Sequence, residues 1–157
     1  RKFHNEELED RRRDGGEAAR SRTKERYRRV VDAWHGAVVG VHAGYIVGLP
    51  HDRPGCGRAA ARDLAEIGVD IASFFVYTPF PGTEDYEAAL AAGELSSDDF
   101  NLYDSTHAVR RHPRLAAAEI EHEYAEAWRA FYSWRRLAWS LASGYRVAGL
   151  GAATRAG

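Results

Sequence analysis

Apolar residues follow two kinds of pattern along this chain: helical stripes and short continuous runs. Residues 17–35 place large apolar side chains at helical spacing, which predicts a helix that ends at Gly36. Residues 37–50 form a nearly continuous, valine-rich run that is typical of a strand buried on both faces of a parallel sheet. Residues 57–68 return to a helical stripe, and residues 69–82 form a second buried run that ends in a proline-rich sequence. The sequence therefore predicts an α/β fold in which the second helix connects two parallel strands.

The remainder of the chain predicts a short helix, a long loop and a long helix. Thr83 is a suitable N-cap for a helix that ends at Gly93. Residues 96–114 show no periodicity, and long loops of this kind in compact domains are often functional. From Ala116 to Leu141, apolar residues recur every three or four positions, which predicts one long amphipathic helix.

Composition places the chain among soluble globular domains. It has 157 residues, of which 45% are hydrophobic and 29% are charged. No apolar run is long enough to predict a transmembrane segment. The single cysteine, Cys56, excludes an internal disulfide and fits a reducing compartment, which favours the cytoplasm. The chain contains no methionine and begins at Arg1 with sequence typical of a domain interior, so we expect a fragment of a longer protein.

Basic residues are concentrated at the amino end. Residues 1–29 hold 11 of the 22 Lys and Arg residues and 7 acidic residues, although the net charge of the whole chain is only −1. This asymmetry has two interpretations, a nucleic-acid-binding arm or the solvated face of an outer helix. We favour the helix face, and no specific nucleic acid as partner, because acidic residues are interspersed and no aromatic platform lies among the arginines.

The first predicted strand ends with glycines at alternate positions. Side chains alternate between the two faces of a strand, so Gly44, Ile46 and Gly48 are predicted to share one face, while the opposite face packs on helices. Two interpretations stay open on spacing alone. The gaps admit a flat ligand ring against bare backbone, or they relieve crowding inside a barrel.

Two motifs resemble a known enzyme family. The sequence "GYIVGLPHD", followed about 30 residues later by "FFVYTPFPGTEDY", resembles the carboxyl-terminal half of the radical S-adenosylmethionine (radical SAM) enzymes. It is most similar to the branch that often carries a cobalamin-binding domain. In that family one strand has a Gly-x-Ile-x-Gly pattern, matched here by Gly44, Ile46 and Gly48, and the next leads into Thr-Pro-x-Pro-Gly-Thr, matched by residues 78–83. The similarity covers roughly residues 25–140, and the two motifs in order are more specific than either alone.

The resemblance implies a fold and a division of the chain. Residues 1–95 would form the carboxyl-terminal portion of a partial (β/α)6 TIM-type barrel with parallel strands, incomplete without the amino-terminal half of the barrel. Residues 96–142 would form the long loop and long helix after the barrel, and the Gly- and Ala-rich residues 143–157 a flexible tail.

The resemblance also implies cofactors and a site. Gly44, Ile46 and Gly48 would hold the adenine and ribose of S-adenosylmethionine, and Tyr77 and Thr78 would supply backbone groups near the adenine edge. The intact enzyme would use a 4Fe–4S cluster, and in some members cobalamin, to modify or methylate an unreactive carbon of a small-molecule or lipid-like substrate.

This chain departs from the family in two respects. The cluster is normally held by Cys-x3-Cys-x2-Cys, and Cys56 alone cannot hold it, so the segment is predicted to be inactive by itself. The family also places an acid three residues beyond the second glycine, where this chain has His51, with Asp52 next. A competing hypothesis is a non-catalytic α/β domain that binds a nucleotide or a protein partner.

The long loop contains further polar candidates. Asp104, Ser105 and His107 include the residue types of a hydrolytic triad, but no strand–turn–helix elbow presents the serine. We interpret Asn101, Tyr103, Asp104 and His107 as polar groups on the substrate side of the parent enzyme, with solvated loop residues as the alternative. The histidines show no zinc-binding spacing, so no metal site is predicted.

Overall fold

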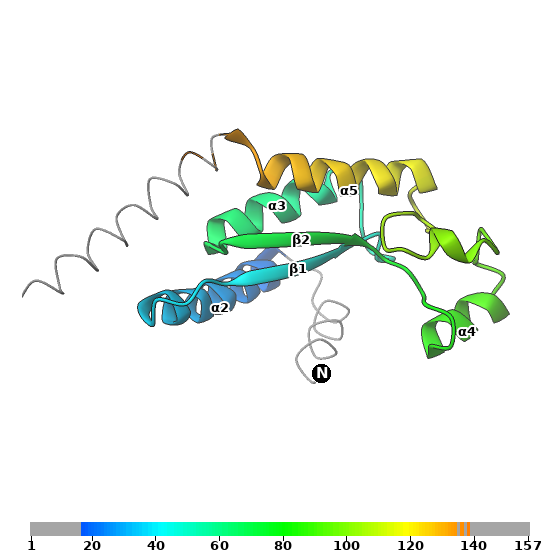
Figure 1. The fold of residues 1–157 in the computed structure, drawn as a ribbon, viewed down its shortest axis with the longest axis horizontal. Coiled ribbons are helices and arrows are strands. Elements are labelled where there is room, and N and C mark those ends of the chain that lie inside the picture. The colour runs from blue at the N-terminus through cyan, green and yellow to red at the C-terminus, as the bar shows by residue number, and fades with distance from the viewer. Residues whose placement is uncertain (1–16, 135, 137, 139–157) are drawn as a thin grey trace, which may run out of the picture.

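The chain folds as an α/β unit in the computed structural model, which describes residues 17–134, 136 and 138 (Figure 1). The elements in chain order are α2 (Glu17–Gly36), β1 (His42–Val47), α3 (Cys56–Ile67), β2 (Ile71–Val76), α4 (Glu84–Ala91), the short 3-10 helix η1 (Phe100–Leu102) and α5 (Ala117–Phe131). In the part of the chain that is described, none of these helices has the length and apolar content needed to cross a membrane.

The described sheet has two parallel strands, β1 and β2, joined by the crossover helix α3. Its register pairs Gly44 with Ser73 and Ile46 with Phe75. The predicted helix–strand–helix–strand order is confirmed, but the first strand is shorter than the apolar run that predicted it. Residues 37–41 form the turn after α2, where Val38 adopts a φ of 59° and donates its N–H to the carbonyl of His35. The predicted strand is too long because apolar content alone does not distinguish these turn residues from strand residues.

One face of the sheet is covered by helices. Val31 of α2 and Ala60 of α3 belong to the same buried cluster as Ala127 of α5 and Phe74 of β2. Phe74 makes edge contacts with the rings of Trp128 and Phe131, at centroid distances of 5.5 and 6.0 Å. The three helices run opposite to the strands (Figure 1), as expected for successive βα units.

The outer edge of β2 is closed by groups from two later segments, the residue after α5 and the loop between α4 and α5. The Tyr132 hydroxyl donates to the carbonyl of Ala72 and accepts from its N–H, at 2.8 and 3.2 Å. The carbonyl of Ser105 accepts from the N–H of Val76 at 2.7 Å. These bonds satisfy backbone groups that an exposed edge strand would offer to another chain.

The predicted long helix is interrupted where this closure occurs. Helix α5 ends at Phe131, and Tyr132 leaves helical geometry as its C-cap. Trp134 falls on the apolar stripe predicted between Ala116 and Leu141, but it is 88% exposed, so that part of the prediction is wrong. Leu141 and the predicted flexible tail, residues 143–157, lie outside the described residues.

The opposite face of the sheet has no covering layer among the described elements. His42 and Gly44 of β1 are exposed on it, and Ile71 and Phe75 of β2 are 54% and 43% exposed. This open face, defined by His42, Gly44, Ile46, Ile71, Ser73 and Phe75, is the one that a barrel would turn inward. The described residues form an α/β unit with two strands, and the predicted partial barrel is not confirmed by it.

Candidate functional site

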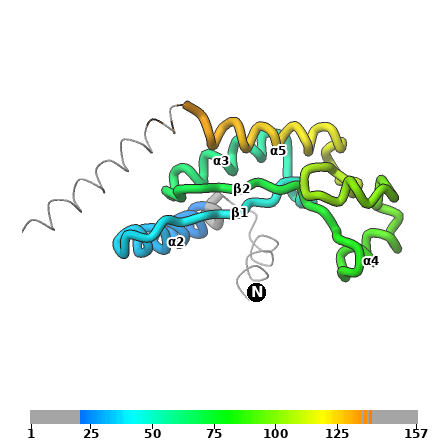
Figure 2. Tube along the Cα trace, viewed as in Figure 1, coloured from blue at the N-terminus to red at the C-terminus, as the bar shows by residue number. Residues whose placement is uncertain are grey.

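The carboxyl ends of β1 and β2 meet a tight turn and a folded loop. Figure 2 shows the chain between α4 and α5 doubling back beside these strand ends. The loop is closed by an antiparallel bridge between Leu95 and Arg110 and by a backbone bond from Arg111 N to Glu94 O at 2.7 Å. Ligands of parallel α/β proteins bind beyond such strand ends, so this region is the candidate site.

Asp52 fixes the turn that follows β1. Its side chain is 6% exposed, and Oδ2 accepts from the N–H groups of Gly48 and Leu49 at 2.9 and 3.0 Å. Asp52, one residue beyond the position at which the resemblance leads us to expect an acid, therefore bonds the main chain of the strand end. His51, at the expected position, is half-exposed with Nε2 3.8 Å from Asp52 Oδ1.

Gly48 does not continue the open face. It has a φ of +90°, which favours glycine, and it is buried. A Cβ at Gly48 would lie 3.0 Å from Ile120 Cγ2 of α5. The alternation that predicted a shared face ends at Val47, because the turn rotates the next residue toward the helical layer. The missing side chain at Gly48 thus accommodates the turn and Ile120.

Gly44 and Ile46 lie together on the open face. A Cβ at Gly44 would approach only the Phe75 side chain, at 3.7 Å from Cε2. Below them, toward the start of the strands, His42 Nε2 lies 2.9 Å from Ser73 Oγ. A flat patch of main chain is therefore bordered by apolar side chains on one side and a polar pair on the other.

Tyr77 and Thr78 follow β2 at the same end of the sheet. The Tyr77 N–H donates to the carbonyl of Val47 at 2.7 Å. It therefore extends the hydrogen-bond ladder between β1 and β2 and is not free to bind a ligand. Thr78 is buried, and its hydroxyl donates to the carbonyl of Val76 at 3.1 Å. The backbone groups left for a ligand are the Tyr77 carbonyl and the Thr78 N–H, for which no partner occurs in the described part of the chain.

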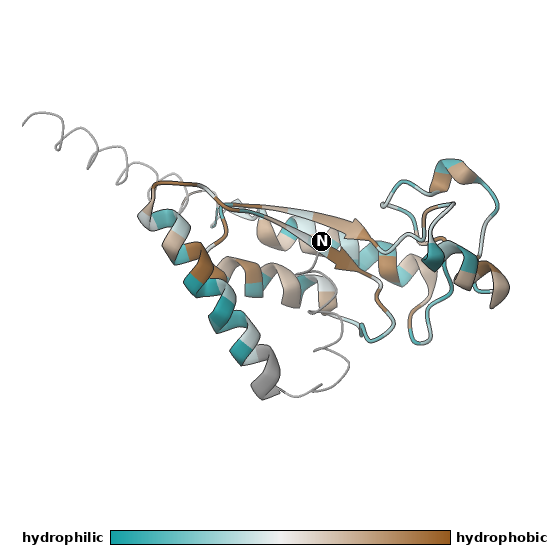
Figure 3. Cartoon of the chain, turned by 90° about the horizontal axis from the view of Figure 1, so that it is seen from below, coloured by the Kyte–Doolittle hydropathy of each residue, from teal (hydrophilic) through white to brown (hydrophobic). Residues whose placement is uncertain are grey.

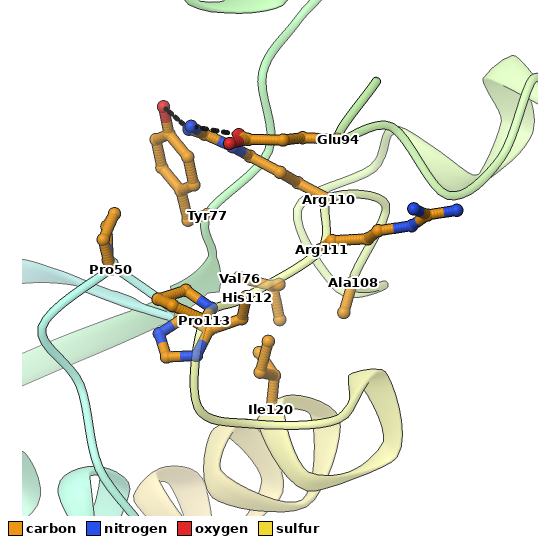
Figure 4. Close-up of a pocket in the computed structure, with 11 residues that line it drawn as sticks. Pro50, Val76, Tyr77, Glu94, Ala108, Arg110, Arg111, His112, Pro113 and Ile120 are labelled. Carbon is orange, nitrogen blue, oxygen red and sulfur yellow. Dashed lines mark hydrogen bonds and ion pairs between the residues drawn. The ribbon is translucent and has the colours of Figure 1, made fainter. Parts of the chain in front are cut away.

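A pocket of about 280 Å³ lies between these strand ends, the loop and the start of α5 (Figure 4). Gly48, Val76 and Ile120 are among its lining residues. At its polar end Arg110 donates from Nε to Glu94 Oε2 at 2.8 Å and from Nη1 to the Tyr77 hydroxyl at 3.1 Å. Burial, reinforced by the carboxylate of Asp85, raises the pKa of Tyr77.

His112 is a structural residue of this pocket. Its Nε2–H donates to the carbonyl of Leu49 at 2.8 Å, and Nδ1 accepts from the N–H groups of Arg114 and Leu115 at 3.1 and 3.0 Å. Both ring nitrogens are thus occupied in the neutral form. Sequence analysis missed Glu94, Arg110 and His112, because only closure of the loop brings them to the strand ends.

The predicted substrate-side residues fall into two groups. Asp104 accepts from the N–H and hydroxyl of Thr106 and lies 3.0 Å from His107 Nδ1. Burial alone would raise the pKa of Asp104, but the hydrogen bonds from Thr106 and His107 outweigh it and lower this pKa. The hydrogen bond to Asp104 in turn raises the pKa of His107. This exposed cluster surrounds Ser105, which has a φ of +65°. The carbonyl of Ser105 accepts the hydrogen bond from the N–H of Val76 in β2.

The other two face their own loop. Asn101 donates to Asp99 at the start of η1. Tyr103 is buried, and its hydroxyl donates to the carbonyl of Ser97 at 2.8 Å. Asn101 is exposed but bonds only within its loop, whereas the exposed Asp104–His107 pair adjoins Ser105, which bonds the end of β2.

Cys56 does not have the environment of a metal ligand or a nucleophile. It is half-buried at the start of α3, and desolvation, with the charges of Asp52 and Glu123, raises its pKa from 9.0 to about 12. No cluster of three or more His, Cys, Asp or Glu side chains suited to a metal ion occurs among the described residues.

We therefore expect Cys56 to react slowly with iodoacetamide in the folded chain. At pH 8 alkylation is expected to be at least about tenfold slower than in urea, because less of the thiol is ionised. The same shift makes the free energy of unfolding fall as the pH rises from about 9 toward 12, since the unfolded chain loses its thiol proton first. Because the chain has one cysteine, mass spectrometry follows this site alone. Equal rates in the two states would contradict the assigned burial.

Comparison with known proteins adds no assignment: no family model matches this chain, and no curated protein matches it at a significant level.

Proposed function

We propose that this chain is the carboxyl-terminal part of a radical SAM enzyme and that its open face receives the nucleoside of S-adenosylmethionine. The observation that carries the proposal is the exposed main chain at Gly44, which pairs with Ser73 in mid-strand and shares the open face with Ile46, the residue nearer to the carboxyl end of β1. The two sequence motifs indicate S-adenosylmethionine as the ligand, and the open patch offers its nucleoside a surface to bind.

The described residues fit the nucleoside. Ile46 and Phe75 are register partners and offer apolar contact to the face of a purine, while the absence of a side chain at Gly44 lets the ring approach the main chain. The Tyr77 carbonyl and the Thr78 N–H offer one acceptor and one donor, which is the combination that the amino and ring-nitrogen edge of adenine requires. Asp52 contributes by holding the strand-end turn.

The described residues do not fit the iron–sulfur cluster. The only cysteine of the chain is half-buried and resists ionisation. In the proposed parent protein, the ligands of the cluster would therefore come from the amino-terminal half of the barrel. The segment alone is proposed to be inactive. Cobalamin and a small-molecule or lipid-like substrate likewise belong to the proposed parent.

The exposed Asp104–His107 pair is the part of the loop that we assign to the substrate side. It sits at the carboxyl end of β2, held there by the bond between Ser105 and Val76. With Asp104 ionised and the pKa of His107 raised, the pair can orient a polar group of the substrate or hold a proton at His107 Nδ1.

The proposal is tested by filling the patch at Gly44. In the parent enzyme with its cluster in place, Gly44→Leu is expected to weaken binding of S-adenosylmethionine about 100-fold or more, because the new side chain occupies the nucleoside position. Formation of 5′-deoxyadenosine should fall in parallel at subsaturating ligand. Gly36→Leu is the control, since a Cβ at Gly36 meets no atom within 4 Å.

Unchanged binding by the Gly44 variant, with the fold intact by circular dichroism, would overturn the proposal. So would an upstream coding sequence that lacks Cys-x3-Cys-x2-Cys.

A second candidate is a non-catalytic binding domain, favoured by the pocket at Arg110. Its apolar base and its polar end, made by Arg110, Tyr77 and Glu94, suit a small ligand with one hydrogen-bonding end. Nucleotide affinity that Arg110→Gln abolishes and Gly44→Leu leaves unchanged would favour this candidate over the radical enzyme.

A further inference from the structure

The end of α2 and the turn that follows it expose large apolar side chains. Val30 and Trp34 of α2 are 49% and 52% exposed, and Val38 and Val39 of the turn are 78% and 42% exposed. We call these four residues the apolar tip. Figure 3 shows the hydrophilic first turns of α2 and the hydrophobic segment that connects its end to β1. Large apolar side chains gathered in one exposed place are typical of a surface that contacts another molecule.

Val38 occupies its position at a cost to the fold. Its φ of 59° lies in the left-handed region, which is unfavourable for a β-branched side chain. The turn is held by hydrogen bonds from the N–H groups of Ala37 and Val39 to the carbonyl of Trp34, both at 3.0 Å. Because the Val38 side chain is exposed, burial does not offset the strain. Glycine or asparagine would adopt this backbone more readily, so packing within the described residues does not explain a valine here.

Exposed arginines adjoin the apolar tip. Arg22, Arg26 and Arg29 are exposed on α2, and their spacing of three and four residues places them on one face of the helix. Arg26 precedes Val30 by four residues, and Val30 precedes Trp34 by four, so the basic and apolar parts are continuous along the helix. No ion pair of Arg26 or Arg29 occurs among the residues that the structure describes.

The other basic side chains of α2 bind α3. Lys24 pairs with Asp63 at 2.9 Å and with the carboxylate of Glu66. Arg28 donates to the main-chain carbonyl of Glu66. These two residues therefore attach α2 to its neighbour, whereas the charges of Arg26 and Arg29 are directed to solvent and attract an anionic partner.

We propose that the apolar tip and the exposed arginines of α2 bind the surface of an anionic phospholipid bilayer, with Trp34 and Val38 inserted between the headgroups. Tryptophan is enriched at this depth of a membrane, and arginines are attracted to anionic headgroups. A short apolar insertion and a set of positive charges together give reversible attachment, which neither provides alone. The turn at Val38 projects its side chain outward, as insertion requires.

Two other partners fit the surface less well. A nucleic acid would pair with the arginines, but Val38 and Val39 would gain nothing from its phosphates, and aliphatic side chains do not provide a stacking platform for bases. A second copy of the chain that joined its apolar tip to this one about a two-fold axis would bring two sets of arginines together, and like charges repel.

The apolar tip lies away from the candidate site. Figure 1 shows the turn after α2 at the amino-terminal end of the strands, opposite to α4 and the loop that follows it. A bilayer bound there leaves the carboxyl ends of β1 and β2 accessible from the other side. The inference therefore goes beyond the proposed function and does not depend on it.

Vesicle flotation tests the inference with the 157-residue chain. The chain should bind vesicles of phosphatidylcholine and phosphatidylserine far more tightly than vesicles of phosphatidylcholine alone, and added salt should weaken the binding. Arg26→Gln with Arg29→Gln should lower the affinity about tenfold or more. Arg53→Gln with Arg62→Gln removes the same charge from exposed positions outside α2 and should leave the affinity nearly unchanged.

Val38→Asn separates membrane binding from folding. Asparagine tolerates the left-handed backbone, so the thermal midpoint should stay the same or rise, while the affinity for anionic vesicles should fall about tenfold. Leu90→Asn is the matched control, because Leu90 is 53% exposed on α4. Tryptophan emission should shift to shorter wavelength when vesicles are added, and Trp34→Phe should abolish most of that shift.

Several results would overturn the inference. They are absence of vesicle binding, equal binding to both kinds of vesicle, and equal losses of affinity in Val38→Asn and Leu90→Asn. RNA binding without vesicle binding, lost in the Arg26 and Arg29 variant and unchanged in Val38→Asn, would assign the surface to a nucleic acid instead. Self-association that Val38→Asn abolishes, again without vesicle binding, would assign it to a second copy of the chain.

Discussion

Replacing Gly57 with alanine is expected to destabilise the chain by about 3 kcal/mol or more, because α3 and α5 touch at this residue. A Cβ at Gly57 would lie 2.0 Å from the main-chain oxygen of Glu123 and 2.8 Å from its carbonyl carbon. These are backbone atoms of α5, so relief requires the two helices to separate. Their separation would also disturb Ala60 and Ala127, which lie in the main buried cluster.

Urea unfolding followed by circular dichroism measures this loss. Gly36→Ala is the matched control, because a Cβ at Gly36 meets no atom within 4 Å, and its midpoint should remain close to that of the unmodified chain. A Gly57→Ala chain with the original midpoint would show that the helices do not cross at this distance.

Replacing Glu123 with alanine is expected to cost about 3 kcal/mol, because the carboxylate caps the start of α3 from α5. Its oxygens accept from the N–H groups of Gly55 and Gly57 at 2.6 and 2.9 Å, and its side chain is 8% exposed. Removing it leaves the buried N–H of Gly57 without a partner and takes the acceptor from the N–H of Gly55, which solvent can reach.

Glu126 provides the comparison on the same helix. It pairs with the exposed side chains of Arg58 and Arg129, and surface pairs of this kind contribute little, so Glu126→Ala should shift the urea midpoint far less. Similar losses for the two variants would contradict the assignment of Glu123 as the cap of α3.

The sequence predicted the order of the helices and strands, because helical stripes and continuous apolar runs mark the side chains that become buried. Thr83 was identified as an N-cap from its residue type, and its side chain accepts from the N–H of Tyr86 at the start of α4. Where the predictions were wrong, a local backbone feature overrode hydrophobicity. Val38 lies in a turn despite its strand propensity, and the helix predicted to extend to Leu141 is interrupted at Tyr132, whose hydroxyl bonds the edge of β2.

The candidate site was less accessible to sequence analysis. The motifs identified Gly44 and Ile46, but strand alternation could not predict that Gly48 turns toward Ile120, because a positive φ ends the alternation. Arg110 and Glu94 are separated in sequence by most of a loop, and they meet only because its ends pair at Leu95. Glu123 reaches Gly57 for a similar reason, through the packing of helices far apart in the chain.

Photoaffinity labelling tests the central claim most directly. The parent enzyme with its cluster would be irradiated with an S-adenosylmethionine analogue that carries an azide on the adenine ring, and the labelled peptides would be identified by mass spectrometry. Label on residues 42–48 and 75–79, reduced by unlabelled S-adenosylmethionine, is the predicted result, because these segments border the open face at Gly44. Label confined to residues 108–113, beside the Arg110 pocket, would contradict the account.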